Sequence, residues 1–223
     1  MSVLFYITDV IFCFYSIAEK NRKLYILTKS LLMPLLLSVY LVFSLRQGGA
    51  AVQKFCVLSL IFHFAGDVCL LFPDIKGGRF MLAGIFSFFL GHVSYTACFA
   101  DIPVRMSLRY SFITLFIMML VEYFLYRQMM LSGSRRYAPV VFVYSSGLVM
   151  LAVSVSSLLE YSPTVIGPAV SLIGVFLFYF SDYCIARRIV RRPIAGQIVI
   201  MGTYIFAQTM IVSGLLLIQQ AVF

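Results

Sequence analysis

The stretch that decides the fold of this chain runs from Leu24 to Leu45 and reads LYILTKSLLMPLLLSVYLVFSL. One charge, Lys29, interrupts it. A helix needs about 20 mostly apolar residues to cross roughly 30 Å of hydrocarbon, so this stretch predicts a transmembrane helix.

The composition extends that prediction to the whole chain. Of 223 residues, 62% are hydrophobic and 11% are charged, whereas about 25% are charged in a typical soluble domain. The mean hydropathy is +1.02. The sequence contains no long polar segment that could form a separate soluble domain. We therefore expect residues 1–223 to form a single transmembrane domain.

Further apolar stretches of similar length follow along the chain. The predicted helices span about residues 3–18, 24–45, 55–72, 80–100, 107–126, 138–159, 164–186 and 194–222. The first lacks the basic start and small-residue cleavage site of a signal peptide, so we interpret it as a retained helix. The sequence predicts an all-α polytopic membrane protein with eight transmembrane helices.

The basic residues predict how the chain is oriented. Most follow the first, third, fifth and seventh predicted helices, namely Lys20, Arg22, Lys23, Lys76, Arg79, Arg127, Arg135, Arg136, Arg187, Arg188, Arg191 and Arg192. Because cytoplasmic loops are enriched in Lys and Arg, those segments should face the cytoplasm and both termini the other side (in a bacterium, of the inner membrane). The net charge of +9 then reflects topology and attraction to anionic lipid, with no nucleic-acid partner.

Two aspartates lie inside apolar helices in similar surroundings. They are Asp67, within FHFAGDVC, and Asp182, within FYFSDYC. A charge at the centre of a membrane helix costs about 2.5–3.5 kcal/mol on insertion scales, so such a residue is a functional candidate by default. The alternative is that each aspartate is a structural hydrogen-bond anchor.

Other polar residues fall at similar depths. Lys29, Asp67, Glu122 and Asp182 each lie roughly 7–9 Å inside the same predicted membrane face, at 1.5 Å per residue. Their convergence would form one interior cavity open toward the cytoplasm. Alternatively, Lys29 snorkels to the headgroups. Glu122 or Asp9 could pair with Arg109 or Lys29, or Glu122 could face the headgroups. Deeper polar residues predicted to line the cavity are His92, Tyr95, Tyr204 and Gln208.

The two halves of the chain show a faint repeat. An offset of 115 residues carries Asp67 onto Asp182 and Cys69 onto Cys184. Four helices per unit would give a 4+4 parallel repeat about an axis along the membrane normal, with the site at the repeat interface.

Five motifs occur in order on five of the predicted helices. They are Thr28-Lys29-Ser30-Leu31-Leu32-Met33-Pro34-Leu35, Gly66-Asp67-Val68-Cys69-Leu70, Gly91-His92-Val93-Ser94-Tyr95, Gly167 and Phe176 leading into Ser181-Asp182-Tyr183-Cys184-Ile185-Ala186, and Thr203-Tyr204-Ile205-Phe206-Ala207-Gln208. With these motifs, the chain resembles the lysoplasmalogenase (YhhN-type) family of eight-helix membrane proteins over nearly its whole length. Ser30 departs from the family pattern, which usually has Pro after Thr-Lys.

The resemblance implies hydrolysis of the vinyl ether bond of lysoplasmalogens, giving a fatty aldehyde and a glycerophospho-ethanolamine or -choline. That reaction needs an acid still protonated near neutral pH and a carboxylate that orients water. We expect Asp67 and Asp182 to form this acid–base pair and Lys29 to bind the phosphate or bias their ionisation. His92, Tyr95, Tyr204 and Gln208 would position substrate and water, with no cofactor or metal required.

Three other functions use the same residues. A proton-coupled transporter of lipids or small molecules fits the repeat. A metal-dependent hydrolase would recruit His63, His92 and the aspartates, and a lipid-binding scaffold would need no chemistry. The sequence indicates a lysophospholipid substrate and a bilayer as partners, and it gives no indication of oligomeric state.

Overall fold

All the regular structure that the computed structural model describes is helical. It describes residues 1–47, 53–72, 78–131, 138–189 and 193–223. The basic residues Lys76, Arg135, Arg136, Arg191 and Arg192, used above to predict the orientation, lie outside these residues. The helices are α1 (Ser2–Ala18), α2 (Arg22–Arg46), α3 (Lys54–Leu70), α4 (Arg79–Ala100), α5 (Leu108–Leu131), α6 (Ala138–Ser156), α7 (Ile166–Ile189) and α8 (Gln197–Val222).

Six of these helices are long and apolar enough to cross a membrane: α2, α4, α5, α6, α7 and α8. Helix α1 is a shorter apolar helix, and α3 has 17 residues. The predicted class, a polytopic all-α membrane protein, is confirmed. That α1 and α3 also cross the membrane stays a prediction.

Helix α5 carries the apolar surface that a bilayer would cover. Phe112 and Phe116 lie one turn apart and are 66% and 67% exposed. The helix also continues past the predicted end at residue 126 to Leu131. Gln128 explains the extension, since its Oε1 accepts hydrogen bonds from Tyr183 and Arg187 of α7, both 3.0 Å long.

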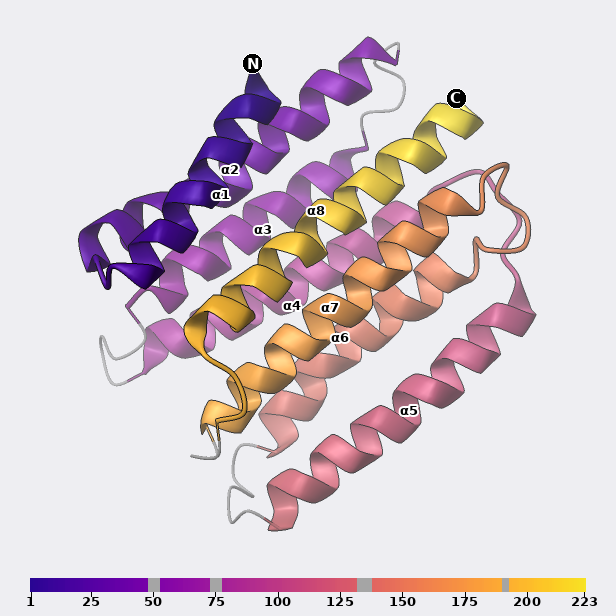
Figure 1. The fold of residues 1–223 in the computed structure, drawn as a ribbon. Coiled ribbons are helices and arrows are strands. Elements are labelled where there is room, and N and C mark those ends of the chain that lie inside the picture. The colour runs from indigo at the N-terminus through magenta and orange to yellow at the C-terminus, as the bar shows by residue number, and fades with distance from the viewer. Residues whose placement is uncertain (48–52, 73–77, 132–137, 190–192) are drawn as a thin grey trace. The chain divides into compact units, whose positions relative to one another are not determined.

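The helices are labelled along the ribbon in Figure 1. By its internal contacts the chain divides into two compact units, and the division falls near the end of α4. Unit 1 comprises Met1–Cys98 with Phe223, and unit 2 comprises Phe99–Val222. In unit 1, α2 packs against both α1 and α3; in unit 2, α6 packs against α5 and α7, and α7 packs most extensively on α8. Each unit therefore contains essentially four consecutive helices.

Small residues set how closely helices approach within each unit. A Cβ on Gly91 of α4 would lie 2.5 Å from Cε1 of His63 on α3. In unit 2, a Cβ on Gly214 of α8 would lie 2.5 Å from the carbonyl oxygen of Gly167 on α7. Glycine is the residue that fits at both contacts, as is common where membrane helices pack closely.

Candidate functional site

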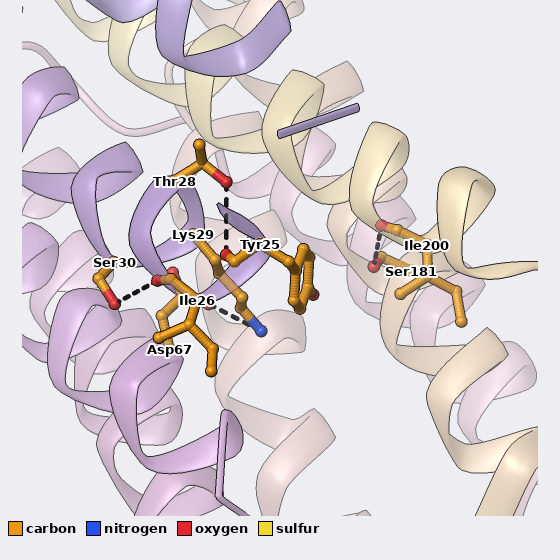
Figure 2. Close-up of polar contacts among 8 residues, drawn as sticks. All are labelled: Tyr25, Ile26, Thr28, Lys29, Ser30, Asp67, Ser181 and Ile200. Atoms are coloured by element: carbon orange, nitrogen blue, oxygen red, sulfur yellow. Dashed lines mark hydrogen bonds and ion pairs between the residues drawn. The ribbon is translucent and has the colours of Figure 1, made fainter. Parts of the chain in front are cut away.

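In unit 1, the candidate site is built around an ion pair between α2 and α3. Nζ of Lys29 lies 3.5 Å from Oδ1 of Asp67, and their side chains are 11% and 1% exposed (Figure 2). Lys29 is therefore directed at a buried carboxylate. A cation at this distance offsets the cost of burying the negative charge of Asp67.

The helix around Lys29 is held by local hydrogen bonds. The side chain of Asn21 caps α2 by accepting from the Leu24 amide. Thr28 Oγ1 donates to the carbonyl oxygens of Leu24 and Tyr25, at 3.0 and 3.3 Å. The Tyr25 ring centroid lies 6.0 Å from Nζ of Lys29. These contacts satisfy polar groups within α2 and leave the ammonium to face Asp67.

Helix α1 adds a further buried carboxyl group to unit 1. Asp9 is 7% exposed, and within the described part of the chain its Oδ2 atom has no hydrogen-bond partner. Neither Lys29 nor Arg109 forms an ion pair with it among the described residues.

His92 and Tyr95 lie together on α4, as their spacing predicts, and both contact His63 of α3. The ring centroid of His63 is 5.1 Å from that of His92 and 5.3 Å from that of Tyr95. All three side chains are 0% exposed. Ser59 ties the same helices together by donating to the carbonyl oxygen of Gly91 at 2.8 Å. The cluster is a polar seam between α3 and α4.

In unit 2, Asp182 of α7 is paired with a tyrosine of α6. Tyr144 Oη donates a hydrogen bond of 2.6 Å to Oδ2 of Asp182. Both side chains are partly exposed. Beside Asp182, Ser181 donates to the carbonyl oxygen of Ile200 at 3.0 Å and fixes α7 against α8 (Figure 2).

A second carboxyl group, which is buried, lies in the same unit. Glu122 of α5 is 3% exposed and accepts hydrogen bonds from Ser145 of α6 at 2.8 Å and from Tyr179 of α7 at 3.0 Å. Glu122 therefore joins three helices. Its partners are hydroxyl groups, and among the described residues it forms no ion pair with Arg109 or Lys29.

Helix α8 holds the remaining predicted site residues. The ring of Tyr204 packs edge-on against Phe178, with centroids 5.3 Å apart, and Phe178 lies one turn from Asp182 on α7. Gln208, one turn beyond Tyr204, is 0% exposed.

The predicted site residues thus fall into separate sets. Lys29 and Asp67 are brought together in one set, and His92 and Tyr95 in another. Asp182, Tyr204 and Gln208 belong to unit 2, so a shared cavity with the unit 1 residues stays a prediction. Among the described residues, no group of three or more His, Cys, Asp or Glu side chains is placed to hold a metal ion.

The principal residue that the sequence analysis missed is Tyr144. A lone tyrosine in an apolar helix carries no signal of its own. The offset of 115 residues, however, carries Lys29 onto Tyr144 just as it carries Asp67 onto Asp182. Applying the repeat to both members of the ion pair would have identified it.

The fold and these polar pairs define a class: a multi-helix membrane protein in which each four-helix unit holds an aspartate of an apolar helix beside a polar side chain of the neighbouring helix. The YhhN family model matches residues 24–215. The chain belongs to the YhhN family. Searches of curated proteins and of solved structures gave no significant match.

Proposed function

We propose that this protein is a membrane-embedded hydrolase that cleaves the vinyl ether bond of a lysoplasmalogen. The observation that carries the proposal is the occurrence, in a YhhN-family chain, of two intramembrane aspartates, each held by a neighbouring polar group. Asp67 is 3.5 Å from Lys29, and Asp182 is 2.6 Å from Tyr144. Fixed carboxyl groups in an apolar environment suit acid–base chemistry.

The reaction needs one carboxylic acid and one carboxylate. The acid gives its proton to the β-carbon of the vinyl ether, and the resulting oxocarbenium ion is attacked by water, whose proton passes to the carboxylate. The hemiacetal then collapses: its hydroxyl proton returns to the first group, the carbon–oxygen bond to glycerol breaks, and the second group protonates the glycerol oxygen. Both groups are regenerated, as in the related oxocarbenium chemistry of glycosidases.

The other residues have supporting roles in this proposal. Lys29 biases the ionisation of the aspartates or binds substrate phosphate, while Tyr204 and Gln208 position substrate and water. His92 and Tyr95, which pack against His63, also position substrate and water. The long apolar chain of the lysophospholipid lies among the apolar helices, and no cofactor takes part.

The test uses purified protein in detergent with lysoplasmenyl-ethanolamine as substrate. We expect aldehyde release from the parent protein, and a loss of at least about 100-fold in Asp67→Asn and in Asp182→Asn, the range that positioned acid–base groups contribute. Asp101→Asn, which changes an exposed aspartate in a turn, is the matched control. Equal release from all the variants would refute the catalytic roles, and no release from the parent would refute the substrate.

Localisation follows the same proposal: a multi-pass membrane protein with both termini on the non-cytoplasmic side. Reporter fusions after Phe223 that are active in the cytoplasm would contradict this orientation.

The division into two four-helix units favours one alternative, a proton-coupled transporter, because many transporters are built from such repeats. Transport predicts movement of the lysolipid across proteoliposome membranes without aldehyde formation. Hydrolysis predicts aldehyde in detergent, where no transport is measurable.

A further inference from the structure

The Lys29–Asp67 and Tyr144–Asp182 pairs occupy equivalent places in the two units. Each joins the second helix of its unit to the third, α2 to α3 and α6 to α7. Tyr144 and Asp182 are 38 residues apart, which is also the separation of Lys29 from Asp67. Adding 115 to the residue numbers of one pair therefore gives both members of the other: Lys29 corresponds to Tyr144, and Asp67 corresponds to Asp182.

The backbone contacts next to these pairs repeat as well. Ser30 donates to the carbonyl oxygen of Ile26 at 2.8 Å. At the same offset, the Ser145 hydroxyl also lies 2.8 Å from the carbonyl oxygen of Val141, and it shares its single proton between that oxygen and Oε2 of Glu122. A serine hydroxyl thus contacts the backbone one turn earlier, one residue beyond the paired side chain, on both α2 and α6.

Against this shared framework, one exchange changes the chemistry: a cation in unit 1 is replaced by a neutral phenol in unit 2. Among the described residues, no Lys or Arg nitrogen lies within ion-pair distance of Asp182. The titratable groups near it in unit 2 are Tyr144 of α6, and Tyr179 and Cys184 of α7. Tyr179 in turn donates its hydroxyl proton to Glu122 of α5. A cation of the same helix, Arg188, interacts with Cys184. Its guanidinium donates to Gln197 and to the carbonyl oxygen of Ala195 and forms no ion pair with Asp182 among the described residues.

The difference decides which aspartate carries charge at lower cost. A carboxylate in apolar surroundings is destabilised unless it is paired, and a full positive charge offsets that cost more than one neutral hydrogen bond does. A protonated carboxyl group avoids the cost altogether. Tyr144 donates to Oδ2 of Asp182, which leaves Oδ1 to carry the proton.

We infer that unit 2 is a diverged copy of unit 1 in which Tyr144 replaces Lys29, and that this exchange divides the acid–base work. Asp67 is the ion-paired carboxylate that activates water, and Asp182, positioned by Tyr144, is the acid that protonates the substrate. The assignment of these roles rests on the proposed hydrolase function. The difference in protonation between the two aspartates does not.

The test is labelling with dicyclohexylcarbodiimide, read by peptide mass spectrometry on the purified full-length protein. The reagent reacts with protonated carboxyl groups: the acid proton moves to a carbodiimide nitrogen while a carboxyl oxygen bonds to the central carbon. We expect Asp182 to react about tenfold faster than Asp67, the ratio that corresponds to about 1.4 kcal/mol of charge stabilisation. Equal labelling of the two, or faster labelling of Asp67, would overturn the inference.

Two substitutions at position 144 control for access of the reagent. Tyr144→Lys restores the cation of unit 1, and labelling of Asp182 should fall about tenfold, whereas Tyr144→Phe should leave it labelled. Unchanged labelling in Tyr144→Lys would refute the role of the exchange. If labelling behaves as expected but no variant releases aldehyde, the division of protonation stands and the proposed substrate fails.

Discussion

The Lys29–Asp67 ion pair predicts a thermodynamic coupling between α2 and α3. At 3.5 Å between Nζ and Oδ1, and with an effective dielectric constant of about 20, Coulomb's law gives an attraction of about 5 kcal/mol. Removing one partner leaves the other charge buried and uncompensated, which typically costs about 3–5 kcal/mol. Lys29→Met or Asp67→Asn alone should destabilise the protein by that amount, whereas the double variant should cost about 2–3 kcal/mol less than the sum of the two single variants.

The buried cysteines provide the assay. Cys13, Cys56, Cys98 and Cys184 are each 0% exposed, so a thiol-reactive fluorophore labels them when the protein unfolds. For a chain of this size, a loss of 3–5 kcal/mol lowers the melting temperature by about 6–20 °C. The coupling in the double-mutant cycle should be about 2–3 kcal/mol.

Lys54→Met is the matched control, because Lys54 is exposed at the start of α3. It should change stability by less than about 0.5 kcal/mol. The reasoning is refuted if the costs of the two single variants add in the double variant, or if Lys29→Met is as stable as Lys54→Met.

Three further outcomes are expected. Glu122→Leu should destabilise the protein by about 1–3 kcal/mol, because the Tyr179 hydroxyl loses its acceptor, while aldehyde release per folded molecule persists; a melting temperature equal to that of the parent would contradict this. Gly214→Ala should lower the stability of the protein by about 1–3 kcal/mol, because the added Cβ overpacks α7 against α8. The control Gly196→Ala, with nothing within 4 Å of its added Cβ, should leave stability unchanged. Equal effects of the two variants in the thiol assay would disprove the close contact. Gly91→Ala should lower stability by a similar amount by displacing His63, and a stability unchanged from that of the parent would be inconsistent with the packed seam.

The helices were predictable because the length of an apolar stretch is set directly by bilayer thickness. All eight appear near their predicted positions, and their ends are where prediction and structure differ most. Helix α5 extends past Tyr126 because Gln128 bonds to residues of α7. A tertiary contact of that kind leaves no trace in local hydropathy.

The site was predictable in part, for a related reason. Depth along a helix follows from residue counting, which placed Lys29 and Asp67 at the same level. Rotation about the helix axis decides which side chains meet, and that depends on packing across helices. Counting residues along the helices therefore left two cations, Arg109 and Lys29, as possible partners of Glu122. In the structure its hydrogen-bond partners are Ser145 and Tyr179.

The same ion pair has a consequence for the biogenesis of the protein. During synthesis α2 emerges before α3, so Lys29 would enter the bilayer as a solitary ammonium, at a cost of about 2.5–3.5 kcal/mol on insertion scales. Asp67 alone would meet a similar cost. The two charges compensate each other once both helices are present. We therefore expect α2 and α3, the latter a predicted membrane helix, to integrate as a helical hairpin in which Asp67 removes the cost of the buried ammonium of Lys29.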